Sequence, residues 1–270
     1  MMNIDALCRL SDIQLYQFFS EYPIKWVSCF IPVEKQEHIV RCTKLKDENG
    51  EVFSISRLSY CPSPLLADNV YNRCSLPKQE MFYGTLYGEE DDEIQHALIT
   101  SVFEVSNLCH ETSEEDEFYL SGIWRATRDI TTIIIFDNNQ PAKNTFFNRA
   151  KQRAEIFLAE HPNEDLGDMT LVEAFSRDVK ENIDYRITAV YSDFLFKRFP
   201  IDAIVYPSVR TGKVGTCIAI RPSFVDSGGI ELVSTSKYRL YSEGEKSVRG
   251  VICQHGSIDM QAGKINYVKI

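Results

Sequence analysis

The sequence of 270 residues predicts an α+β fold. Apolar residues recur at helical spacing in several segments, of which residues 3–20 are the first. Runs of β-branched residues, such as Thr131–Ile135, are typical of strands that pack on a buried surface. Several extended segments follow one another in residues 203–270. We therefore expect a small N-terminal segment packed onto one main α+β domain with a β-rich C-terminal part.

The first half of the chain alternates between both kinds of element. Helices are expected at residues 3–20 and 92–101, the second preceded by acidic residues that suit a helix N-terminus. Extended segments are expected at residues 24–33, 38–45, 51–58, 81–86, 102–105 and 119–125. The turn signal Asp47–Gly50 separates two of them, and prolines in the irregular segment that follows residue 58 prevent regular structure there.

The second half begins with a strand and three helices and ends in strands. A strand is expected at residues 131–136, and helices are expected at 141–160, 169–181 and 184–198. The remaining strands are expected at residues 203–206, 216–221, 230–241, 248–254 and 264–270. By sequence, we divide the chain into residues 1–50, a main domain at 51–230, and an extension at 231–270 packed on the same domain.

Composition excludes several classes of protein. Hydrophobic residues make up 44% and charged residues 25%, which is ordinary for a globular protein and excludes wholesale disorder. The longest apolar run is too short to span a bilayer, and no secretory signal is visible, so we expect a cytoplasmic protein with no membrane partner. A net charge of −10 argues against direct binding of nucleic acid.

The cysteines and histidines do not form a familiar site. Eight cysteines without a C-x-x-C pair favour reduced thiols. None of the five histidines has metal-ligand spacing, so no metal is expected. Cys217 with His255 is the one pair that we keep open as nucleophile and base, and a buried structural cysteine is the commoner interpretation. No glycine-rich phosphate loop of the Rossmann or P-loop pattern occurs.

Four blocks of residues remain, and each is unremarkable alone. They are Ser56-Arg57-Leu58; Asn72–Pro77 followed by Met81–Gly84; the segment from Ala97 to Glu104; and Ile204–Arg210 followed by Gly215–Pro222 and Val225-Asp226. Taken singly, Arg73 is most simply a surface arginine and Tyr83 a core residue. Glu104 is most simply an exposed strand position, and Ser208 a turn residue. Their order and spacing together favour a functional site.

These blocks resemble the RES domain family, which is named for its arginine, glutamate and serine blocks. The match runs from about residue 53 to 226. The resemblance implies an ADP-ribosyltransferase-like core and an enzyme that consumes NAD, either as a glycohydrolase or as an ADP-ribosyltransferase. It also implies the toxin of a bacterial toxin–antitoxin pair, with an Xre-like helix-turn-helix antitoxin as partner. For residues 1–50 and 231–270, which lie outside the match, covering the site, homo-oligomerisation and partner binding stay open.

The resemblance also assigns roles to individual residues. It makes Arg73, Tyr83 and Glu104 the catalytic residues, and Arg57, Ser208 and Cys217 part of the NAD-binding site. The sequence departs from the family pattern at three positions and also carries an acidic insertion around Gly88–Glu93, between Tyr83 and Glu104. Asn72 replaces a glycine, and Ser75 and Cys217 each replace an asparagine. These departures motivate the alternative that the chain is a catalytically inactive RES-like module that binds a nucleotide or a protein.

The chemistry of these side chains fits NAD cleavage. The planar guanidinium of Arg73 can bind the oxygens of a diphosphate in pairs. The ring of Tyr83 offers a flat face to nicotinamide. Breaking the bond between nicotinamide and ribose builds positive charge on the ribose, and the carboxylate of Glu104 can stabilise that charge and deprotonate water. The hydroxyl of Ser208 can bind the ribose or the nicotinamide amide.

Overall fold

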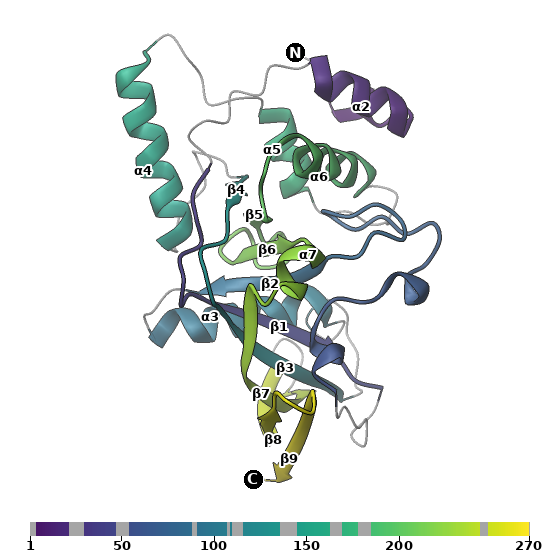
Figure 1. The fold of residues 1–270 in the computed structure, drawn as a ribbon, viewed down its shortest axis with the longest axis vertical. Helices are drawn as coiled ribbons and strands as arrows, with labels where there is room; N and C mark the ends of the chain where they lie inside the picture. Colours follow the sequence, from purple (N-terminus) through teal and green to yellow (C-terminus); the bar gives the residue numbers. More distant parts are fainter. Residues whose placement is uncertain are drawn as a thin grey trace.

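The computed structural model describes residues 4–21, 30–46, 54–87, 91–106, 109, 116–135, 145–162, 169–177, 185–243 and 248–269. The chain forms an α+β fold in which one large mixed sheet carries helices (Figure 1). Helix α2 lies at one end of the molecule and strand β9 at the other (Figure 1). The sheet therefore runs through most of the structure and determines where the candidate site lies.

The sheet has nine strands in the order β4-β5-β6-β2-β1-β3-β7-β8-β9. The strands are β1 (His38–Lys44), β2 (Phe82–Tyr87), β3 (Glu117–Ala126), β4 (Thr132–Ile134), β5 (Ala203–Pro207), β6 (Thr216–Ile220), β7 (Ile230–Ser242), β8 (Val248–Asp259) and β9 (Lys264–Lys269). All neighbours are antiparallel except β4 and β5, which are parallel. Strands β4, β5 and β6 are buried along their whole length, which agrees with their continuous apolar sequences.

The joint between β1 and β2, where these two strands pair, has a short ladder. Strand β1 pairs with β3 through all seven residues from His38 to Lys44. It pairs with β2 through three residues only, His38 to Val40. Beyond Val40 the two strands have no ladder between them, so the sheet opens at its centre.

Seven α-helices cover the sheet. They are α1 (Ile4–Leu7), α2 (Asp12–Glu21), α3 (Asp91–Val105), α4 (Thr145–Glu160), α5 (Met169–Ser176), α6 (Arg186–Arg198) and α7 (Pro222–Asp226), within the described residues. Helix α3 packs against β1 and β2, beside the opening of the sheet. Helices α2, α5 and α6 pack together near β4 and β5 (Figure 1). The ring of Phe19 on α2 contacts Tyr191 on α6 at 4.8 Å between centroids.

Most of the elements predicted from sequence are confirmed, with shorter bounds for the helix expected at 169–181 and for the strand expected at 131–136. The first residues of the helix expected at 141–160 lie outside the described residues. Three predictions are wrong. The helix expected at residues 3–20 is two helices, because Ser11 starts α2 with a reciprocal cap: Ser11 N–H donates to Gln14 Oε1, and Gln14 N–H donates to Ser11 Oγ. Part of the segment expected at 24–33 lies outside the described residues.

The other two errors concern segments expected to be strands, residues 51–58 because of their alternating pattern and residues 102–105 because they are apolar. Residues 55–58 form a 3₁₀ helix, η2 (Ile55–Leu58), whose first turn is capped by Ser54. A second such turn, η3 (Ser63–Leu65), follows in the proline-containing loop. Residues 102–105 continue helix α3 and do not form a strand. A short apolar run fits a buried helix turn as well as a strand, so the pattern alone could not separate them.

The division of the chain into three parts stays a prediction. Strand β1, from the expected N-terminal part, lies at the centre of the sheet, and strands β7 to β9 extend the same sheet. Within the described ranges, no helix is both long enough and apolar enough to cross a membrane.

Gly84 gives the first testable prediction, because it allows β2 to approach β1. A Cβ at this position would lie 2.5 Å from Ile39 Cγ2 and 3.0 Å from the Val40 carbonyl oxygen. We expect Gly84→Ala to lower the free energy of unfolding by about 1–3 kcal/mol in urea titrations. The matched control is Gly250→Ala on β8, where the nearest atom is the tip of Leu240 at 3.1 Å. Equal stability of the two variants would contradict the close approach at the joint.

Candidate functional site

A cavity of about 310 Å³ occupies the opening between β1 and β2. Residues of both strands, of α3, of β5 and of β6 line it, together with the loop before β2 and the residue before α6. The lining includes Arg73, Tyr83, Glu104 and Cys217, four of the six residues that the sequence analysis singled out. These four come from segments far apart in the chain, and the fold brings them together.

Glu104 lies in the last turn of α3 and not in a strand. A carboxylate near a helix C-terminus is disfavoured by the helix dipole, so this position needs compensating donors. Ser208 Oγ donates a hydrogen bond to Glu104 Oε1 at 2.5 Å, and the thiol of Cys217 donates to the same oxygen at 3.7 Å. Among the described residues, no hydrogen bond ends on Oε2, which leaves that oxygen available to a ligand.

The loop between β5 and β6 brings Ser208 to Glu104. Ser208 is fully buried, and its N–H donates to the Gly215 carbonyl across the loop. A Cβ at Gly215 would lie 2.2 Å from Thr100 Oγ1 on α3, so only glycine permits this close approach of loop and helix. Ser208 does not itself line the cavity, and its hydroxyl holds the Glu104 carboxylate, which does.

Tyr83 is held through its hydroxyl group. Its Oη accepts a hydrogen bond from the Cys74 N–H at 3.2 Å and shares one with Ser75 Oγ at 2.9 Å. Burial is the main cause that raises the pKa of Tyr83 far above its ordinary value, so the phenol is neutral at physiological pH. Ser75, one of the departures from the family pattern, therefore positions the tyrosine ring at the cavity.

Arg73 lies between aromatic rings at the cavity wall. Its guanidinium carbon is 4.8 Å from the ring centre of Tyr185 and 5.9 Å from that of Tyr206. Its Nη1 donates to the Phe175 carbonyl at the end of α5 at 2.5 Å, and its Nη2 donates to the Tyr185 hydroxyl at 3.4 Å. These contacts fix the plane of the guanidinium and satisfy only two of its five N–H groups among the described residues.

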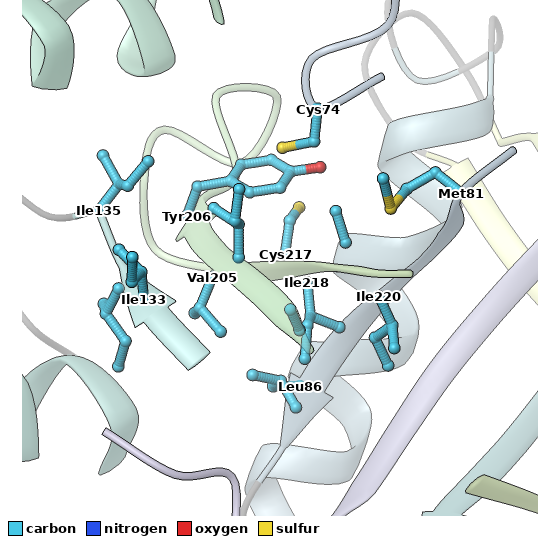
Figure 2. Close-up of a cluster of buried hydrophobic side chains, with 14 of the residues drawn as sticks. Cys74, Met81, Leu86, Ile133, Ile135, Val205, Tyr206, Cys217, Ile218 and Ile220 are labelled. Carbon is cyan, nitrogen blue, oxygen red and sulfur yellow. The ribbon is translucent and has the colours of Figure 1, made fainter. Parts of the chain in front are cut away.

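Tyr206 and Cys217 line the cavity, and Cys74 lies beside the Tyr206 ring. The ring of Tyr206 lies between the thiols of Cys74 and Cys217, among apolar residues of β4, β5 and β6 (Figure 2). Burial raises the pKa of Cys74 to about 12. Burial, with a smaller effect of the Glu104 charge, raises the pKa of Cys217 well above its ordinary value. Both groups are therefore neutral thiols, and Cys217 serves Glu104 as a donor.

The sequence analysis missed Arg41. This residue lies on β1 at the point where pairing with β2 ends, and its Nη1 donates to the Tyr83 carbonyl oxygen at 2.6 Å. Its Nε is buried without a hydrogen-bond partner among the described residues. Burial, and to a lesser degree the charge of Arg57, lowers the pKa of Arg41 to about 10, so it remains a cation at neutral pH. A lone arginine in a strand pattern carries no signal that could have identified it.

Arg57 lies outside this cavity. It is exposed on η2 and lines a second cavity of about 750 Å³, to which Arg41 also contributes. Arg41 lines both cavities. The structure thus brings Arg73, Tyr83, Glu104 and Cys217 together in the first cavity. Ser208 contacts this group through its hydrogen bond to Glu104, and Arg57 lines the second cavity instead.

The pairing of Cys217 with His255 is wrong. Cys217 is on β6, and His255 is on β8, five strands away in the sheet. At roughly 4.8 Å per strand, the two residues are on the order of 24 Å apart. His255 is exposed, and its Nδ1 shares a hydrogen bond with Ser236. A nucleophile and its base need direct hydrogen-bond contact, which this separation excludes.

No protein-family model matches the chain, and no curated protein matches it significantly. The properties of the site therefore rest on its own geometry.

The neutral state of Cys217 can be tested by alkylation. We expect native protein treated with iodoacetamide at pH 7.5 to be labelled at the exposed Cys8 and to remain unlabelled at the buried Cys217, measured by peptide mass spectrometry. Labelling in guanidinium chloride is the control and should reach both residues. Labelling of native Cys217 as fast as Cys8 would show a reactive thiolate and contradict its role as a donor.

Proposed function

We propose that this protein cleaves the bond between nicotinamide and ribose in NAD. The observation that carries the proposal is the convergence of Arg73, Tyr83 and Glu104 on one cavity, with Ser208 bound to the carboxylate. An RES-like, ADP-ribosyltransferase-like core is part of this proposal. It is supported by the order of the blocks in the sequence and by the α+β fold in which they meet.

In the proposed reaction, the bond between ribose C1′ and the nicotinamide nitrogen breaks, and the electron pair leaves with neutral nicotinamide. Positive charge develops on the ribose, and the Glu104 carboxylate stabilises it. Water then bonds to C1′, and Glu104 accepts its proton. The products are nicotinamide, ADP-ribose and one proton. Ser208 and Cys217 hold the carboxylate by Oε1, which leaves Oε2 for this chemistry among the described contacts.

The remaining residues would bind the substrate. Arg73 and Arg41 both line the cavity, and both retain N–H groups without partners among the described residues. They suit the diphosphate oxygens. The ring of Tyr83 offers a face to nicotinamide. With a protein side chain in place of water, the same site would transfer ADP-ribose, and an antitoxin partner stays a prediction.

Glu104 provides the direct test. Purified wild type is expected to release nicotinamide from NAD, and Glu104→Gln is expected to be slower by on the order of 100-fold or more, because the uncharged amide cannot stabilise the ribosyl cation. Release is measured by chromatography of nicotinamide. Glu160→Gln, at an exposed position on α4, is the matched control and should retain wild-type activity. Equal release by wild type and Glu104→Gln would refute the assignment.

Ser208 tests how the carboxylate is held. We expect Ser208→Ala to lower kcat about tenfold, because Glu104 loses its strong donor, and to leave KM for NAD within about twofold. Ser223→Ala, at an exposed position of α7, is the control. A rise in KM with kcat unchanged would instead mean that the hydroxyl contacts the substrate.

The second candidate is an inactive module that binds NAD without cleaving it. It is favoured by the engagement of Arg73 with the Phe175 carbonyl and the Tyr185 hydroxyl, which is also what a purely structural arginine does. Calorimetry distinguishes the two functions: binding of NAD with no nicotinamide release, by a protein of intact fold, would favour the inactive module.

A further inference from the structure

Residues 248–253 of β8 have a strand neighbour on one side only. Strand β8 pairs with β7 from Val248 to Gly256, whereas its pairing with β9 begins at Gln254. Among the described residues, the segment 248–253 is therefore an open edge of the sheet. The backbone N–H and C=O groups on the outer side of such an edge can pair with a further strand. Strands β8 and β9 lie at the end of the molecule away from α2, where a second molecule can approach (Figure 1).

The other edges of the sheet are protected. Sheet edges are commonly blunted by short strands, by covering segments or by charged side chains, lysine above all. Strand β4, at one end of the sheet, is only three residues long, and Phe30 forms a bridge to its Ile133. Strand β9, at the other end, begins with Lys264 and ends with Lys269, and Ser54 forms a bridge to Lys264. The open edge of β8 carries neither kind of protection in the part of the chain that the structure describes.

The side chains of the open edge are mostly apolar and β-branched. Val248, Val251 and Ile252 are 38%, 40% and 39% exposed. The single charged residue of the segment is Arg249, and its Nη1 lies 3.0 Å from Glu243 Oε1 of the same chain. An exposed edge of this composition, with its one charge already paired, favours pairing with another strand.

An apolar groove of about 650 Å³ adjoins the open edge. Val248 and Gly250 line it from β8, and Tyr238 and Leu240 line it from β7. Helix α3 forms its other wall, where Ile99 is about half exposed. Because alternate residues of a strand share a face, the even-numbered residues of the open edge face this groove. A strand added at the edge would extend the sheet beneath the groove and turn every second side chain toward it.

We propose that the open edge pairs with the same edge of a second copy of this chain, antiparallel, about a twofold axis that passes through Gly250 perpendicular to the sheet. Such an axis keeps each side chain on its own face. It places Val248 opposite the partner's Ile252, and Arg249 opposite the partner's Val251. Glycine at the axis brings no side chain against itself, and no like charges face each other. This self-complementarity is what favours a second copy. The inference does not depend on the proposed function.

Sedimentation equilibrium at micromolar concentrations tests the dimer and its register. Wild type is expected to dimerise. Val251→Lys places a second cation opposite the partner's Arg249 at both symmetric positions, so we expect the Kd of the dimer to rise about tenfold. Val251→Glu places a carboxylate opposite the same arginine, so we expect its Kd to equal that of wild type or to be lower. Val268→Lys, at an exposed position of β9, is the matched control and should dimerise like wild type.

Gly250→Cys tests the position of the twofold axis. Residues directly opposite in an antiparallel pair have Cα atoms about 4.5–5.5 Å apart, which a disulfide can span. A Cβ at position 250 meets only the tip of Leu240, at 3.1 Å, so we expect the variant to fold. In a background with Cys8→Ser and Cys253→Ser, mild oxidation should link Gly250→Cys into a dimer on non-reducing electrophoresis. Asn266→Cys, at an exposed position of β9, is the control and should remain unlinked.

Each outcome supports or overturns the proposal, once circular dichroism shows that the variants are folded. A wild type that stays monomeric at all concentrations would overturn it and leave the open edge to an extended segment of another protein. An equal loss of dimer in Val251→Lys and Val251→Glu, or a disulfide in Asn266→Cys but not in Gly250→Cys, would refute the pairing about Gly250. Dimerisation is measured without NAD, so its failure is distinct from a failure of the proposed reaction.

Discussion

The structure depends on how the short pairing of β1 with β2 is stabilised where the ladder ends. An antiparallel ladder that stops after three residue pairs leaves backbone groups at the centre of the sheet without strand partners. Side chains supply what the ladder does not: Ser101 Oγ accepts from the Cys42 N–H at 2.9 Å, and Arg41 donates to the Tyr83 carbonyl at 2.6 Å. These two hydrogen bonds replace ladder bonds at the opening, as buried backbone groups require.

The same opening explains why the candidate site draws on distant parts of the chain. One side of it is formed by β1 and α3, and the other by β2 and β6. Thr85 ties the two sides together, because its Oγ1 donates to the Val40 carbonyl on β1 and to the Ala97 carbonyl on α3. The cavity therefore needs residues from both sides of the opening, and β1 with α3 or β2 with β6 could not form it alone.

Sequence patterns predicted the strands well, because buried strands such as β5 and β6 are short apolar runs bounded by turns. They failed at residues 102–105 and 55–58, where a local cap or a preceding helix decides between two conformations that suit the same apolar run. In the site, the blocks identified Arg73, Tyr83 and Glu104, which lie together. Arg41 could not be predicted, since its role arises from where a strand pairing ends, and that is a property of the tertiary structure.

Ser75 and Cys217, two of the departures from the family pattern, each form a hydrogen bond to a residue that lines the first cavity. Ser75 bonds the hydroxyl of Tyr83, and Cys217 donates to Glu104. A thiol is a weaker donor than an amide, so Ser208 provides the strong hydrogen bond to the carboxylate.

The position of Glu104 is itself informative about function. A carboxylate in the last turn of a helix opposes the helix dipole, at a cost of about 0.3–1 kcal/mol, and this one is also partly buried. The stability of α3 gains nothing from it, while a glycine at 215 and a fully buried serine at 208 are arranged to hold it. Local rules of stability are most often broken at functional sites, and Glu104 is where this fold breaks one.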